Sequence, residues 1–297
     1  MKPVDISRMF LAQLNARKPE IFVWTWSTSV GCLLAGHGFP PVEKILLAVS
    51  SITALAISGY TYNDIADLEA DALNEQKKRI RPLPSGKLSA KDAIKIVWFF
   101  GFLGFFLAVF TTPMAFLLTV LWAFLLYSYS NPKIRLKKRF LCKEFVISIG
   151  FFLAILIGAL SVGELSQVVW FVSILMFAFS MFLLPALREA LDIEEDKING
   201  VKSLSTLIKL KTKVEMAILF IFIVMTLTPL TYANFNLNVV FPLVTVATSF
   251  IVLRFLFPLL TRFDLDTHRQ AYRATYAFWL GFQISLVIGT LPLSIGI

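Results

Sequence analysis

Histidine and cysteine are scarce in this chain, with two residues of each among 297. His37 and His268 fall in distant parts of the sequence, and Cys32 and Cys142 show no pairing pattern, so neither a zinc site nor a disulfide framework is indicated. The chain also lacks a P-loop, a GxGxxG fingerprint and a Ser-His-Asp set. No nucleic-acid-binding motif accompanies the net charge of +9. These absences argue against the common soluble enzyme classes and against a nucleic-acid partner.

Apolar residues are abundant instead, since 57% of the chain is hydrophobic and the mean hydropathy is +0.76. Such values are typical of polytopic membrane proteins. Because a lipid-exposed segment must satisfy its own backbone hydrogen bonds, and no alternating strand pattern is present, we expect helices. The apolar runs cover residues 21–36, 44–62, 94–110, 113–130, 144–160, 166–187, 216–233, 239–260 and 275–296. The sequence therefore predicts an all-α membrane protein, a bundle of about nine transmembrane helices that forms a single polytopic domain over residues 1–297.

The basic residues fall on one side of this predicted topology. The N-terminus, the loops after the second, fourth, sixth and eighth runs and the run ends beside those loops hold every Lys and Arg except Lys44. Such an excess marks the cytoplasmic side, so we expect a cap of loops on the cytoplasmic face of the cell membrane. No small-residue cleavage site follows the charged residues 1–20, which predicts that this segment is retained.

The most distinctive stretch is GYTYNDIADLEADALNEQKKRIRPLPSGK at Gly59–Lys87. Asp64, Asp67 and Asp71 recur there at i, i+3 and i+7, which on an α-helix confines the carboxylates to an arc of roughly 60°. Carboxylates crowded at the end of an apolar run repel one another and need a positive partner. Oxygen ligands without His or Cys suit a hard cation, and Mg²⁺ commonly shares such a site with substrate phosphates. The stretch therefore predicts a magnesium site.

A second copy of the pattern lies in the other half of the chain. REALDIEED at Arg188–Asp196 aligns without gaps on NDIADLEAD at Asn63–Asp71. The match indicates an internal duplication, with the first motif (63–71) in the N-terminal half and the second (189–196) in the C-terminal half. One acidic helix end alone can be a solvated end, but two matched copies favour a diphosphate held by metal ions. The expected metal ligands are Asp64, Asp67, Asp71, Glu189, Asp192 and Asp196.

A basic loop follows each acidic motif, as a diphosphate site requires. In the first loop Arg81 is the expected diphosphate contact, whereas residues 77–79 are either weaker contacts or charges that only set the topology. Lys202 in the second loop is expected to supply further positive charge. Tyr129 stands at the end of the fourth apolar run, where we expect it to face the substrate cavity.

Taken together, these motifs resemble the UbiA superfamily of intramembrane prenyltransferases. The resemblance covers nearly the whole chain. It is carried by NDxxDxxxD (Asn63, Asp64, Asp67 and Asp71), RPLPSG (Arg81–Gly86), YSNPKIRLK (Tyr129–Lys137), the second DxxxD (Asp192 and Asp196) and GVKSLSTL (Gly200–Leu207).

The resemblance implies a Mg²⁺-dependent transfer of a prenyl group from a polyprenyl diphosphate to a lipophilic or amphipathic acceptor in the membrane. Asp67, Asp71 and Asp192 would be catalytic through the metal ions that bridge the diphosphate. Asn63 would add a neutral ligand to the diphosphate site or hold a carboxylate in place. The isoprenoid tail would lie in an apolar cavity open to lipid, which keeps an allylic cation away from water.

The acceptor is less well defined than the reaction. The stretches KKRIRPLPSG and YSNPKIRLK are similar to those of archaeal members, which favours archaeal isoprenoid lipid synthesis with geranylgeranylglyceryl phosphate as acceptor. An aromatic quinone precursor, a carotenoid or another acceptor is the alternative, because a shared fold does not select a substrate. An ion-coupled membrane transporter is an alternative of another class, because intramembrane acids also mark ion paths.

Overall fold

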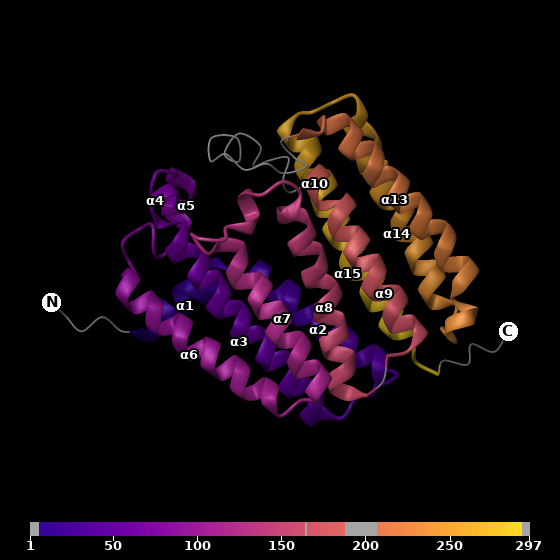
Figure 1. Cartoon of the computed structure of the whole chain (residues 1–297). Helices are drawn as coiled ribbons and strands as arrows, with labels where there is room; N and C mark the ends of the chain where they lie inside the picture. The colour runs from indigo at the N-terminus through magenta and orange to yellow at the C-terminus, as the bar shows by residue number, and fades with distance from the viewer. Residues whose placement is uncertain (1–5, 164, 188–206, 293–297) are drawn as a thin grey trace. The chain divides into compact units, whose positions relative to one another are not determined.

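The computed structural model describes residues 6–163, 165–187 and 207–292 (Figure 1). Every regular element in these ranges is helical, which confirms the predicted all-α class. The α-helices are α1 (Ile6–Ala16), α2 (Lys18–Ala35), α3 (Val42–Ala66), α4 (Leu68–Ala72), α5 (Glu75–Ile80), α6 (Ala90–Val109), α7 (Pro113–Ser130), α8 (Cys142–Val162), α9 (Gln167–Phe182), α10 (Leu184–Leu187), α13 (Leu210–Thr231), α14 (Val240–Leu256) and α15 (Leu265–Gly289). The short 3₁₀ helices are η1 (Leu136–Lys138), η3 (Ala233–Phe235) and η4 (Phe257–Leu260).

Seven helical segments in the described ranges are long and apolar enough to cross a bilayer. They are α3, α6, α7, α8, Gln167–Leu187 (α9 with α10), α13 and Val240–Leu260 (α14 with η4). The predicted runs 21–36 and 275–296 also fall on helices, namely α2 and α15. Both of these helices begin with charged residues, Lys18 and Glu20 in α2 and Asp266 in α15.

The described chain forms two compact units. The first contains α1, most of α2, helices α3 to α7 and the C-terminal part of α8. Its centre is the pair α3 and α6, where Ser51 Oγ donates to the Gly104 carbonyl at 2.8 Å and Ser58 Oγ to the Val97 carbonyl at 2.6 Å. Small side chains at such crossings let two membrane helices approach closely and form interhelical hydrogen bonds. This pair therefore provides a firm support for the acidic motif at the end of α3.

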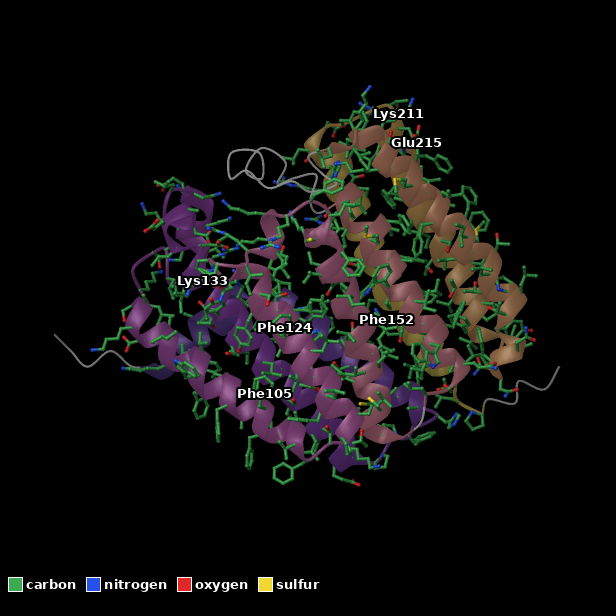
Figure 2. The ribbon with its side chains drawn as sticks, in the orientation of Figure 1. Phe105, Phe124, Lys133, Phe152, Lys211 and Glu215 are labelled. Atoms are coloured by element: carbon green, nitrogen blue, oxygen red, sulfur yellow. The ribbon has the colours of Figure 1, made fainter. Side chains whose placement is uncertain are left out.

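The outer face of α6 carries large rings. Trp98, Phe99, Phe102 and Phe106 are all exposed, as expected for a surface solvated by lipid chains. Figure 2 labels Lys133, which lies in the loop that follows α7.

A second close crossing in this unit joins α2 to the C-terminal part of α8. A Cβ atom added at Gly31 would overlap the carbonyl oxygen of Ile155, and one at Gly158 would overlap that of Thr28. The Cys32 thiol donates to the Gly158 carbonyl, with 3.3 Å between sulfur and oxygen. The two backbones thus touch because glycine stands on both helices.

The second unit contains the N-terminal part of α8, helices α9 and α10, and helices α13 to α15. Helices α14 and α15 pack through Phe241 and Phe282, whose ring centres lie 5.5 Å apart. The turn before α14 is held to the end of α15 by Asn238, whose amide nitrogen donates to the carbonyls of Ile288 and Leu291 at 2.8 and 3.1 Å. The second acidic motif, with Glu189, Asp192, Asp196 and the following Lys202, lies outside the described residues.

Candidate active site

The first acidic motif lies where α3 ends and α4 begins. The sequence predicts one continuous helix through Asp71, but the backbone at Asp67 (φ −106°, ψ 7°) interrupts it. Helical hydrogen bonds nevertheless meet at this residue from both sides, since the Asp67 amide donates to the Asn63 carbonyl at 3.0 Å and the Asp71 amide to the Asp67 carbonyl at 2.8 Å. Figure 1 shows α4 beside α5, which carries the basic residues that follow.

Asp64 is the most buried carboxylate of the motif, with none of its side chain exposed. The guanidinium of Arg17 donates to both of its oxygens, through Nε to Oδ2 at 3.3 Å and through a shorter bond from Nη2 to Oδ1. Gln13, near the end of α1, adds a bond from Nε2 to Oδ2 at 2.6 Å. Burial alone would lower the pKa of Arg17, but the Asp64 carboxylate outweighs it and raises that pKa above its usual value. The guanidinium of Arg17 is therefore charged.

Asp71 is held by cations from α5 and from the loop after it. Lys77 Nζ donates to Asp71 Oδ1 at 2.9 Å. Arg81 Nη1 donates to Asp71 Oδ2 and also lies 3.4 Å from Asp64 Oδ1, so one guanidinium links two carboxylates. Lys78, in contrast, is exposed and lies 3.7 Å from the exposed carboxylate of Glu75. Of the basic residues 77–79, Lys77 is the one that contacts the acidic motif.

Asp67 is the most exposed carboxylate of the three, with 16% of its side chain accessible. Its Oδ1 accepts a hydrogen bond from Arg135 Nη2 at 3.2 Å, and its Oδ2 accepts one from Asn63 Nδ2 at 3.1 Å. The Asn63 amide nitrogen also donates to Ser130 Oγ at 2.5 Å. Because both donors of the amide are used, its oxygen is oriented away from them, and there it accepts a bond from Arg17 at 3.2 Å.

The ligand atoms of this cluster are of the kind that a hard cation prefers, but their present geometry does not form a metal-binding site. Asn63, Asp67 and Asp71 offer only oxygen ligands, which suit Mg²⁺. Within the part of the chain that the structure describes, however, no group of three His, Cys, Asp or Glu side chains is close enough to hold a metal ion. Each carboxylate instead has a basic partner. The repulsion that the sequence predicts is thus relieved here by guanidinium and ammonium groups.

Tyr129 lies in the last turn of α7 and is half-buried, in line with its expected place at a helix end.

Several site residues were not apparent from the sequence. Four residues contact the motif from distant parts of the sequence, and no local spacing predicts such contacts. They are Gln13, Arg17, Ser130 and Arg135. The basic residue before the first apolar run was a weak signal for Arg17, since such a residue is usually a simple membrane anchor.

The seven candidate spans, together with a buried cluster of acids and bases at the end of one of them, define an integral membrane protein with a polar site at its helix ends. The model of the UbiA prenyltransferase family matches residues 24–282. The chain therefore belongs to the UbiA prenyltransferase family, and it is a membrane-embedded prenyltransferase.

Similar proteins include two kinds of transferase. The digeranylgeranylglyceryl phosphate synthase of Sulfurisphaera tokodaii is 28% identical over 84% of this chain and 87% of its own length. The 4-hydroxybenzoate octaprenyltransferase of Vibrio campbellii is 26% identical over 65% of this chain and 66% of its own.

Solved structures show the same fold. A digeranylgeranylglyceryl phosphate synthase superposes with a TM-score of 0.74 at 21% identity, over 97% of this chain and 100% of the other. A UbiA homologue from Archaeoglobus fulgidus bound to DMAPP and Mg²⁺ gives a TM-score of 0.67 at 15% identity, over 92% of this chain and 99% of the other.

Proposed function

We propose that the prenyl acceptor is geranylgeranylglyceryl phosphate and that the reaction is an ether-lipid step of archaeal isoprenoid lipid synthesis. The observation that carries this proposal is the similarity to the Sulfurisphaera tokodaii digeranylgeranylglyceryl phosphate synthase, which extends over 84% of this chain. An aromatic acceptor is the second candidate, because the Vibrio campbellii 4-hydroxybenzoate octaprenyltransferase is similar over a shorter part of the chain. The solved homologue with DMAPP and Mg²⁺ supports a prenyl diphosphate donor and a magnesium cofactor.

The residues of the first motif divide the work in this proposal. Asp67 and Asp71 would hold Mg²⁺, with Asn63 keeping the Asp67 carboxylate in place, and the acids Glu189, Asp192 and Asp196 of the second motif would do the same. Bound Mg²⁺ would neutralise the charge that grows on the departing diphosphate. Arg81 supplies a guanidinium for the diphosphate oxygens, and Lys202 a further ammonium. Tyr129 would line the substrate cavity.

Asp64 belongs to the expected metal ligands as well, but its environment differs from that of Asp67 and Asp71. Its side chain is wholly buried, and the guanidinium of Arg17 engages both of its oxygens. We propose that Asp64 contributes to the metal site through the position of α3 and Asn63, and that it has at most a minor share in direct coordination.

The membrane arrangement of the proposal retains nine spans in a single domain. Besides the seven apolar segments, α2 and α15 would cross the bilayer, since they have 18 and 25 residues and about 20 residues span the hydrocarbon core. The acidic motif and its basic partners would lie at the cytoplasmic face, which the distribution of Lys and Arg along the chain supports.

The test is a transfer assay on the purified protein in detergent, with geranylgeranyl diphosphate as donor. Geranylgeranylglyceryl phosphate and 4-hydroxybenzoate are compared as acceptors, each with and without Mg²⁺. We expect Mg²⁺-dependent product with the glyceryl phosphate and none with the aromatic acid. The reverse preference would move the chain to the second candidate acceptor.

The same assay tests the site residues. Asp67→Ala and Asp192→Ala should each lower the rate by about a hundredfold or more, the scale of losing a group that stabilises transition-state charge. Glu69→Ala is the matched control, because Glu69 lies in the same motif but is exposed. If both Asp variants retained the wild-type rate, the metal-site assignment would be wrong, and ion flux in liposomes would test the transporter alternative.

A further inference from the structure

The ion pairs around the first motif differ in how far they are buried. In the pair Arg17–Asp64 the side chains are 6% and 0% exposed. Arg81 and Arg135, the partners of Asp71 and Asp67, are 19% and 32% exposed. A closed pair thus stands beside pairs that open toward solvent, although all of them belong to one cluster.

Arg81 binds an oxygen of Asp71 that a metal ion on this carboxylate would need. Its Nη1 donates to Asp71 Oδ2 while it lies 3.4 Å from Asp64 Oδ1, so the guanidinium lies between two carboxylates. A divalent cation and a guanidinium cannot share the same oxygens without strong repulsion, because two like charges in a partly buried site interact by several kcal/mol. Metal binding to Asp71 therefore requires that Arg81 withdraw.

A diphosphate would offer the displaced Arg81 side chain a new anionic partner. A guanidinium binds carboxylate and phosphate through the same charge-assisted, often bidentate hydrogen bonds. A diphosphate that arrives with the metal ion offers oxygens of this kind, so the displaced side chain exchanges one anion for another. The same holds for Arg135 on Asp67 and for the ammonium of Lys77 on Asp71.

We infer that Arg81, together with Lys77 and Arg135, is an exchangeable counter-ion that neutralises the metal-binding carboxylates in the ligand-free protein and moves to the diphosphate when Mg²⁺ takes those carboxylates. Arg17 and Asp64 do not exchange, because their pair is buried and is held further by Gln13. The inference rests on the proposed metal site. It gives Arg81 two roles of opposite sign, as a competitor of the metal and as a ligand of the diphosphate.

Coupled binding follows from this exchange. A metal ion that binds alone must displace the basic side chains from the carboxylates and leave them without an anionic partner. A metal ion that binds with diphosphate leaves these side chains paired with the diphosphate oxygens. Each ligand should consequently raise the affinity for the other, and by linkage the two factors are equal. Free Mg²⁺ should bind weakly to the ligand-free protein, so the site fills with metal and diphosphate together.

The experiment measures binding rather than turnover. Mn²⁺ replaces Mg²⁺ as a paramagnetic probe, and inorganic pyrophosphate is the anion, both with the full-length protein in detergent. For Arg81→Gln we expect Mn²⁺ alone to bind about five- to tenfold more tightly than to wild type, a factor at the low end of typical coupling between sites. Pyrophosphate in the presence of Mn²⁺ should bind more weakly to this variant. Arg135→Gln should shift Mn²⁺ binding in the same direction.

Lys78→Gln is the matched control, because it removes one positive charge from α5 at a side chain that lies near Glu75 and away from the acidic motif. Its Mn²⁺ affinity should stay within about twofold of wild type, as expected for a solvent-screened charge. If Arg81→Gln bound Mn²⁺ alone no more tightly than wild type, or if Lys78→Gln gave an equal gain, the exchange would be refuted.

The two proposals fail in different ways. If the wild-type protein transfers prenyl groups with Mg²⁺ but Arg81→Gln leaves the Mn²⁺ affinity unchanged, the exchange is refuted and the proposed function stands. Wild-type protein that binds neither Mn²⁺ nor pyrophosphate in any combination overturns both.

Discussion

The buried pair of Arg17 and Asp64 permits a quantitative prediction about stability. Removal of one partner from a buried ion pair typically costs about 3 to 5 kcal/mol, because a charge is left without compensation. Here the lower end applies, since Asp64 keeps Gln13 and Arg81 when Arg17 is lost, and Arg17 keeps Glu20 and Asn63 when Asp64 is lost.

We therefore expect Arg17→Met and Asp64→Leu each to lower the free energy of unfolding by about 3 kcal/mol. At about 2 °C or more per kcal/mol for a chain of this size, the midpoint of thermal unfolding should fall by about 6 °C. Tryptophan fluorescence of the protein in detergent during heating measures this midpoint.

The double variant distinguishes a paired interaction from two separate effects. With both charges replaced by apolar side chains neither member of the pair is left as an uncompensated charge, and the cost that persists is about 1 to 2 kcal/mol because Gln13 loses its acceptor. The double variant should be more stable than either single variant. Losses that simply add would mean that Arg17 and Asp64 are not coupled, and the account of the buried pair would be wrong.

Three further predictions concern packing, pH and metal. Gly158→Ala should lower the unfolding midpoint by the equivalent of about 1 to 3 kcal/mol, the usual cost of overpacking, because its Cβ would overlap the Thr28 carbonyl oxygen. Gly163→Ala, with open space around it, should be neutral in the same thermal scan. At the start of α15, the Thr267 backbone amide and then its hydroxyl bind the Asp264 carboxylate and lower its pKa. Because the pKa of Asp264 is lower in the folded than in the unfolded protein, the cap stabilises the fold at pH values above the unfolded pKa, and this stabilisation is lost as pH falls through the folded pKa. The difference in unfolding midpoint between wild type and Asp264→Asn should therefore shrink in acid. Chelation with EDTA should abolish prenyl transfer and leave the midpoint of the ligand-free protein unchanged, and added Mg²⁺ should restore the rate; a midpoint that drops in EDTA would contradict the cation-compensated site.

Hydropathy predicted the helices well because a membrane span is a local property of the sequence. The run at 113–130 coincides with α7, and the run at 166–187 coincides with the end-to-end pair α9 and α10. Hydropathy did not indicate which helices pack together. The pairing of α3 with α6 depends on small residues such as Ser51 and Gly104. The sequence alone does not show which neighbouring helix such a residue faces.

The acidic motif was likewise found from its spacing, whereas its basic partners from distant parts of the chain were not. Arg17 and Arg135 reach the motif across 47 and 68 residues of chain, and no periodic pattern links positions so far apart. The charge balance expected from a metal ion alone is met in the structure by these distant side chains. Spacing thus predicted which oxygens gather, and only the tertiary structure shows what neutralises them.

The buried pair also has a consequence for the order in which the chain is made. Synthesis proceeds from the N-terminus, so Arg17 already exists when Asp64 leaves the ribosome. The most buried carboxylate of the cluster can therefore enter the membrane with its partner present. Asp67, the more exposed acid, waits for Arg135 until 68 further residues have been added. The carboxylate that loses most of its contact with water is the one whose counter-charge is made first.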